Sequence, residues 1–170
     1  MKRLFLLLLC ALAGCQGVPW GPLNPAGKPL VGQMYYRGAK RSFVGDFTAR
    51  VSDTDFQLDV SKGPGVALLN VRENGEFARL EGGGHAWHGS VQKFVPAQVR
   101  TWLALRGPLR EATKAKTDGA RAFSILESNA PYRSVMIAGQ AKLQSVNGAP
   151  AKLELDFAGT GEHFVFQFSK

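Results

Sequence analysis

Cysteine is scarce in this chain of 170 residues, which has only Cys10 and Cys15. No cysteine follows residue 15, so the rest of the chain has no intrachain disulfide, no cysteine nucleophile and no cysteine metal ligand. A domain built from those residues must therefore be stabilised by a packed hydrophobic core.

Hydrophobic runs long enough to cross a membrane are also missing. The most apolar stretch, Leu4 to Ala11, follows Lys2 and Arg3 and is much shorter than the roughly 20 residues that a transmembrane helix needs. A charged start, a short apolar middle and small residues before a cleavage point are typical of a secretory signal peptide. We therefore expect residues 1–14 to be a signal peptide.

The end of that segment, Leu12-Ala13-Gly14-Cys15, resembles the lipobox of bacterial lipoproteins. The resemblance implies that Cys15 receives a diacylglycerol, that the chain is cut before it, and that the new amine is acylated. Two or three acyl chains, at about 0.8 kcal/mol per buried CH2, give stable attachment. Gln16 replaces the aspartate that often retains lipoproteins in the inner membrane, so we expect an outer-membrane anchor with the domain facing the periplasm. The alternative is an ordinary signal peptide cut near a cysteine.

Neither sign of charge forms a long run. Removing Lys2 and Arg3 with the signal leaves 19 basic and 13 acidic residues, a net charge of +6, and the longest basic run is Lys40-Arg41. This pattern favours a solvated basic surface, with attraction to anionic lipid head groups as the alternative. It shows no nucleic-acid patch.

Prolines concentrate in one segment before residue 30. Pro19, Pro22, Pro25 and Pro29 exclude a helix and favour an extended tether. We therefore expect a lipidated tether over residues 15–32 and a single β-rich domain over 33–170.

Two strands are predicted next, because apolar and polar residues alternate over 43–51 and over 56–60. Strands at 66–72 and 76–81 then flank Asn74-Gly75, a strong hairpin signal. With those two as loop residues, Val71 pairs with Ala78 and Leu69 with Leu80.

One helix is predicted over 94–106. Pro96 suits its first turn, and Val95, Val99, Trp102 and Leu103 form one apolar stripe. Gly107-Pro108 is a stop signal, and residues 109–119 are either a second short helix or a loop.

The last third returns to strands, at 122–128, 133–146, 151–158 and 163–169, separated by turn residues. The predicted fold class is mainly β: a curved antiparallel sheet of about eight strands, with one or two helices covering its concave side.

No residues point to catalysis. His85 and His88 are three apart, but glycines on both sides argue against a helix, and His163 is the only other histidine for a zinc site. Ordinary loop histidines are the better interpretation, with a metal-dependent envelope hydrolase as a minor alternative. Carboxylate pairs such as Glu73 with Glu76 fall at hairpin ends, where solvation explains them. We expect no catalytic residue, no metal site, no cofactor and no enzyme.

Apolar residues offer a better candidate site. A curved sheet with one covering helix can leave a groove for acyl chains; the alternative is that the same side chains fill one another's space as core. The candidate residues are Phe47, Phe56, Leu58, Leu69 and Leu80 from the sheet and Trp102 and Leu103 from the helix.

The order and spacing of several segments resemble the LolB outer-membrane lipoprotein receptors. These segments are the strands at 43–51 and 56–60, the Gly63-Pro64-Gly65 loop, and the helix at 95–108 with its early proline and its Trp-Leu. The resemblance covers roughly 43–108 and implies a LolA/LolB-like fold, an unclosed β-barrel covered by helices with a hydrophobic interior. Members of that family accept lipoproteins from a soluble periplasmic carrier and insert them into the outer membrane.

Two functions follow as expectations. The first is a lipid-anchored outer-membrane protein that binds acyl chains of lipids or lipoproteins in a hydrophobic groove, serving lipoprotein localisation or transport. The second is a non-catalytic interaction or structural lipoprotein of the cell envelope, with the same fold and a filled core.

Overall fold

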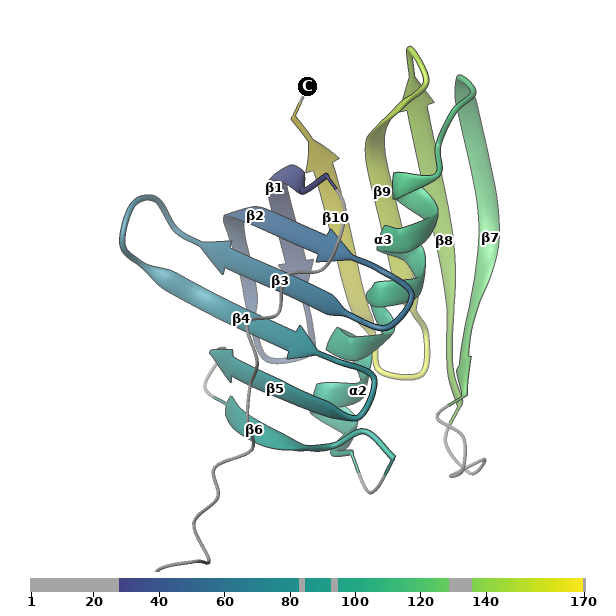
Figure 1. The fold of residues 1–170 in the computed structure, drawn as a ribbon. Helices are drawn as coiled ribbons and strands as arrows, with labels where there is room; N and C mark the ends of the chain where they lie inside the picture. The colour runs from purple at the N-terminus through teal and green to yellow at the C-terminus, as the bar shows by residue number, and fades with distance from the viewer. Residues whose placement is uncertain (1–27, 83–84, 93–94, 129–135, 170) are drawn as a thin grey trace, which may run out of the picture.

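The computed structural model describes residues 28–82, 85–92, 95–128 and 136–169. These residues form ten strands and two helices (Figure 1). In chain order the elements are β1 (Leu30–Arg37), β2 (Ser42–Val51), β3 (Phe56–Ser61), β4 (Ala67–Glu73), β5 (Phe77–Gly82), β6 (His85–Ser90), α2 (Ala97–Ala104), α3 (Arg106–Thr113), β7 (Gly119–Ser128), β8 (Met136–Val146), β9 (Ala149–Phe157) and β10 (Glu162–Phe168).

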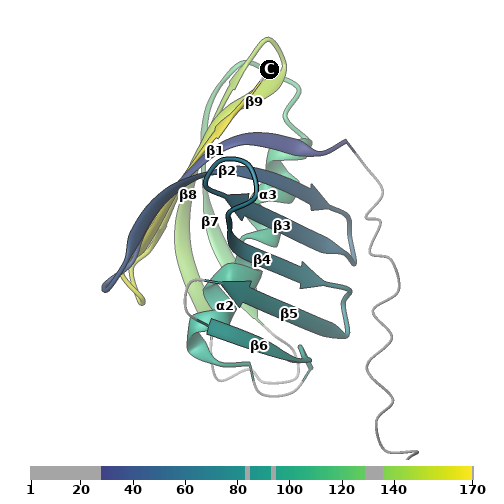
Figure 2. The ribbon, with the colours of Figure 1, turned by 90° about the vertical axis from the view of Figure 1, so that its left-hand side faces the viewer.

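The ten strands form one antiparallel sheet in the order β6-β5-β4-β3-β2-β1-β10-β9-β8-β7. Strand β1 joins the two halves, because it pairs with β2 on one side and β10 on the other. The edges β6 and β7 do not pair with each other, so the barrel stays unclosed. Figures 1 and 2 show both helices on the concave side of the curved sheet. The predicted fold class is confirmed.

Alternating burial explains why these segments form strands around one core. In β3, Phe56, Leu58 and Val60 are buried and the residues between them are only partly covered. In β10, Phe164 and Phe166 face the same interior. The buried apolar residues of the described part run from Met34 to Phe166. A chain that starts at residue 16 keeps all of them together with every described strand and helix, so we expect it to fold on its own.

The β4–β5 hairpin exists, but its predicted register is wrong. Val71 pairs with Leu80 and Glu73 with Ala78, a shift of two residues that leaves the inward face unchanged. The amide of Asn74 donates to the Phe77 carbonyl (3.0 Å), so the loop residues are Gly75 and Glu76. The Asn74 side chain explains the shift, because its Oδ1 accepts from the amides of Glu76 (3.2 Å) and Phe77 (2.8 Å).

The helix predicted over 94–106 ends at Ala104, and a second helix begins at Arg106, so Gly107-Pro108 does not end the helical segment. Pro108 has no amide hydrogen for the Ala104 carbonyl and its ring crowds that oxygen, so the helix breaks at Leu105. Helix α3 restarts at Arg106 because proline is tolerated in a first turn. Residues 109–119 were expected to form either a second short helix or a loop. The helix is the correct alternative for residues 109–113, where α3 ends at Thr113.

Two strands were not predicted. Strand β1 begins at Leu30, inside the segment expected to be the tether, and β6 occupies His85–Ser90, which was expected to be a loop. The predicted signal peptide, Cys15 and the tether as far as residue 27 lie outside the described residues. Within the described part, neither helix is long or apolar enough to span a bilayer.

A candidate hydrophobic ligand site

All seven candidate groove residues are buried. Their exposed fractions are 2% for Phe47, 0% for Phe56, 0% for Leu58, 3% for Leu69, 2% for Leu80, 7% for Trp102 and 6% for Leu103. Leu69, Leu80 and Trp102 line a cavity of about 460 Å³. All seven belong to the hydrophobic core cluster, and Phe47 also lines a separate hollow of about 560 Å³ between β1, β2 and β10. The structure therefore brings three of the seven together at one cavity, and the other four do not line that cavity.

Side chains from both halves of the sheet and from α2 form this cavity, which we call the Trp102 cavity. Its apolar wall combines Leu69 and Leu80 with Trp102 on α2 and Phe43 on β2. Its exposed lining residues lie at the start of α2, at Ala97 and Gln98, and in the connections β1–β2 and β9–β10, and we call this exposed side its mouth. The volume falls in the range of roughly 300–1,000 Å³ that is typical of small-molecule sites.

An aromatic cluster holds the wall in place. The ring of Tyr36 lies 5.2 Å from Phe43, 4.9 Å from Trp102 and 5.0 Å from Phe164, measured between centroids. Trp102 packs edge-to-face on Phe164 at 5.1 Å. Edge-to-face and tilted packing at these distances is favourable beyond simple burial, so Trp102 is fixed by sheet residues on two strands.

The polar groups of the Trp102 cavity gather at its mouth. The Tyr36 hydroxyl donates to Glu162 Oε1 at 2.9 Å. Burial, reinforced by that hydrogen bond and by the negative charge of Glu162, raises the pKa of Tyr36 far above its usual range. The Tyr36 phenol therefore stays neutral. Two cationic side chains, Lys40 and Arg41, line the cavity as well.

A partly buried ion pair connects helix α3 to the sheet. Arg106, the first residue of α3, donates to Glu73 Oε1 at 2.9 Å. The expectation that Glu73 is solvated at a hairpin end is wrong, because the residue is 6% exposed. Its Oε2 has no hydrogen-bond partner among the described residues. Burial raises the pKa of Glu73, and the Arg106 charge only partly opposes this shift.

The raised pKa of Glu73 predicts a pH-dependent stability. A group with a higher pKa in the folded state binds protons preferentially in that state, so its contribution is most favourable below its unfolded value near 4.5 and is lost as pH rises through the folded pKa. Glutamine does not titrate. We expect the free energy of unfolding of the wild type, minus that of Glu73→Gln, to fall in urea titrations as the pH rises above the unfolded value of 4.5. A constant difference would contradict the burial of Glu73.

The histidines are placed apart from this cavity. His88 is exposed on β6, and His163 on β10 lies 2.5 Å from Asp156 Oδ1, measured from Nδ1. The His85 side chain lies outside what the structure describes. Over the described ranges, no three His, Cys, Asp or Glu side chains come close enough to hold a metal ion.

Sequence reasoning missed Tyr36, Phe43, Ala97 and Glu162 as lining residues. Tyr36 had a readable signal, because Met34 and Tyr36 continue an inward alternation along β1. Glu162 had none, since it is 126 positions from its partner Tyr36.

The fold and the cavity define a class of protein: an antiparallel β-sheet not closed into a barrel, with helices inside its curve and an apolar hollow between the two. Comparison of the chain with protein-family models gives no match, and neither does a search of the curated proteins.

Proposed function

We propose that this protein binds an acyl chain of a lipid or lipoprotein in the Trp102 cavity, without forming or breaking covalent bonds. The observation that carries the proposal is the apolar hollow of about 460 Å³, whose wall contains Leu69, Leu80 and Trp102. The sequence pattern predicted those three residues as ligand-binding candidates, and the cavity beside them is formed by the packing of the folded chain.

The distribution of polarity supports this ligand class. An alkyl chain in the cavity would replace water on the surfaces of Leu69, Leu80, Trp102 and Phe43, which is favourable by about 25 cal/mol per Å² of apolar surface buried. A polar head group would remain at the mouth, near Lys40. Binding of this kind is reversible, as a carrier or receptor requires.

The proposed setting is the outer membrane. With a lipid anchor at Cys15, the domain would lie beside a membrane surface and could exchange acyl chains with that membrane or with a soluble periplasmic carrier. This is a role in lipoprotein localisation or transport, and it needs no metal or cofactor.

A second candidate function is a docking lipoprotein of the cell envelope with a filled core. It is favoured by the core cluster, to which all seven candidate residues belong, and by Phe56, Leu58 and Leu103, which do not line the Trp102 cavity. In this alternative the Trp102 cavity has no ligand, and the sheet serves as a rigid scaffold.

Blocking the mouth of the cavity tests the proposal. Ala97 is exposed at the start of α2 and lines the cavity, so Ala97→Trp should fill the mouth without removing a core side chain. We expect it to weaken binding of a fluorescent fatty acid at this site by about tenfold or more, a loss of ~1.4 kcal/mol. The measurement is a fluorescence titration of the chain from residue 16, with Cys15 and its anchor removed.

The matched control is Ala138→Trp, which adds the same ring at an exposed position on β8. It should bind the probe as the wild type does. Binding that Ala97→Trp leaves unchanged, or no binding to the wild type, would favour the docking lipoprotein.

A further inference from the structure

A second apolar hollow lies at the other end of the sheet. It has a volume of about 630 Å³ and is lined by the start of β1, the end of β2, the end of α3, the β8–β9 hairpin and the end of β10. We call it the Leu30 cleft. Its apolar lining residues include Leu30, Val51, Val146, Pro150 and Phe168.

The Leu30 cleft and the Trp102 cavity share no lining residue. Strand β1 begins at the cleft with Leu30 and reaches the cavity at Tyr36, a distance of roughly 20 Å at about 3.3 Å per residue. Between them, the interior is filled by residues such as Met34 and by the edge-to-face pair Phe47 and Phe166, whose centroids are 5.0 Å apart. A ligand in one hollow therefore does not extend into the other.

Large apolar side chains are left exposed around the Leu30 cleft. Val146 is 50% exposed and Val31 is 39% exposed, and both line it. Water on these side chains and on the floor of the cleft is unfavourable, so an apolar chain that covers them would be bound by the hydrophobic effect.

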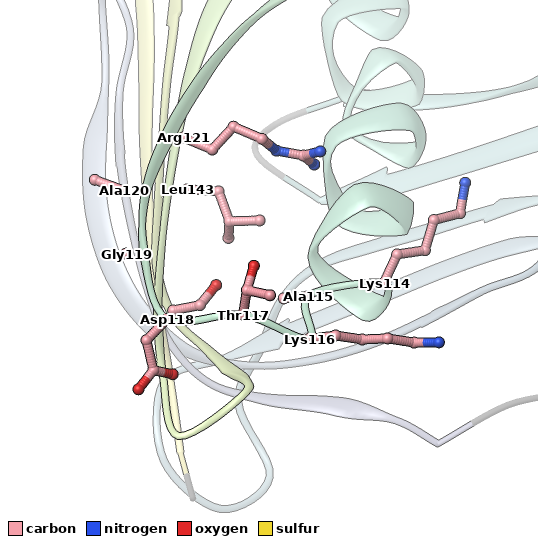
Figure 3. A pocket seen from close by; sticks show the side chains of 10 residues that line it. Lys114, Ala115, Lys116, Thr117, Asp118, Gly119, Ala120, Arg121 and Leu143 are labelled. Carbon is pink, nitrogen blue, oxygen red and sulfur yellow. The ribbon is translucent and has the colours of Figure 1, made fainter.

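The charge at the cleft is positive. Of the described residues in its lining, Lys28 alone has an ionisable side chain. Ala115 also lines a neighbouring hollow of about 250 Å³, which contains Lys114, Lys116, Asp118 and Arg121 (Figure 3).

Acidic residues offset only part of this charge. Glu111 pairs with Lys114 (3.1 Å) and with Arg121 (3.0 Å), and Asp118 accepts from the Gly148 amide (2.7 Å). Lys28 and Lys116 are exposed, and neither has an ion-pair partner among the described residues. Among the described residues that line the Leu30 cleft, none carries a side-chain carboxylate. An anion is therefore the complementary head group.

We propose that the Leu30 cleft is a second binding site, which takes a long-chain anionic amphiphile. The chain packs against Leu30, Val51, Val146 and Phe168, and the carboxylate or phosphate lies at Lys28. This site is separate from the Trp102 cavity and does not depend on the function proposed for that cavity.

Stoichiometry tests the second site. In a titration of the chain from residue 16 with a fluorescent long-chain fatty acid, the wild type should bind two molecules. Val146→Asp should remove one of them, because it places a like charge in the apolar part of the cleft. The control Val66→Asp changes a valine that is 52% exposed and lines neither hollow, and it should keep both.

The head group is tested at Lys28. Lys28→Glu should weaken the second binding event by about fivefold or more for the fatty acid, since a like charge then faces the ligand, and should leave binding of the corresponding alcohol unchanged. Lys62→Glu, an exposed lysine on the β3–β4 connection, makes the same change of charge away from the cleft and should have no effect. Equal losses for acid and alcohol would overturn the anionic assignment.

Two further arms separate the possible outcomes. Cosedimentation with phosphatidylglycerol vesicles that Val146→Asp abolishes would identify the amphiphile as a bilayer lipid, whereas binding of the soluble acid alone would identify a free amphiphile. A single binding event, insensitive to Val146→Asp and lost in Ala97→Trp, would overturn the second site and leave the proposed function standing. The reverse pattern would overturn the proposed function and leave the second site standing.

Discussion

The Gly32→Ala variant is expected to be destabilised by about 3 kcal/mol or more, among the largest effects of any single methyl group in this chain. Gly32 has a φ of 155°, and a Cβ there would lie 1.9 Å from the carbonyl oxygen of Gln167 and 2.9 Å from its carbonyl carbon. Both atoms belong to the backbone of β10, so no side-chain rotation can relieve the overlap. Because β1 joins the two halves of the sheet, the methyl group must push them apart. Urea unfolding followed by circular dichroism measures the loss.

Gly107→Ala is the matched control, with the opposite expected sign. Gly107 lies in α3, has no atom within 4 Å of an added Cβ and has no positive φ. Alanine there should stabilise the protein by about 0.5–1 kcal/mol, because it favours the helix and restricts the unfolded chain. If Gly32→Ala unfolded at the same urea concentration as the wild type, the close approach of β1 and β10 would be contradicted.

The sequence predicted those strands in which one face is buried and the other is not. Residues 43–51, 56–60 and 163–169 alternate clearly, and β2, β3 and β10 follow that alternation. Strand β1 was concealed, since Pro25 and Pro29 precede it and its inward positions include Gly32, which has no side chain to mark the core face. Whether a position is buried depends on the packing of the whole chain. The alternation of apolar and polar residues shows the buried face of a strand only where that face carries large apolar side chains.

The two local errors have the same origin. The hydrogen bonds that the Asn74 side chain accepts shift the β4–β5 hairpin register, and the missing amide hydrogen of Pro108 shifts the helix boundary. Each shift is one or two residues. Propensity rules name these residues correctly as turn and stop signals. They do not say which amide the Asn74 oxygen will accept from, or whether Pro108 falls after a last turn or inside a first one.

The candidate site shows the same limit at longer range. Alternation and helical spacing identified seven inward-facing residues, and all seven are buried. Which of them border a hollow depends on how α2 meets the ends of β1, β4 and β10, which no local pattern records. Glu73 and Arg106 are 33 positions apart in the sequence, so local patterns could not predict their ion pair either.

The Phe164→Ala variant is the second expected large effect, a destabilisation of about 3–5 kcal/mol. Phe164 is 0% exposed and contacts three rings, with centroids 5.0 Å from Tyr36, 5.1 Å from Trp102 and 5.8 Å from Phe157. Removing the ring loses its transfer free energy and leaves a void, since β9 and β1 hold their positions on either side through backbone hydrogen bonds. The free energy of unfolding from urea titration tests this value.

Val165→Ala is the control, because Val165 lies next to Phe164 on the same strand but faces the other side of the sheet and is only partly buried. Its truncation should cost about 1 kcal/mol or less. The comparison also bears on the Trp102 cavity. Phe164 does not line that cavity, yet it supports Tyr36 and Trp102, so its loss should weaken fatty-acid binding even at temperatures where the variant remains folded. A variant that unfolds early but binds with unchanged affinity would show that the aromatic cluster stabilises the sheet without shaping the ligand site.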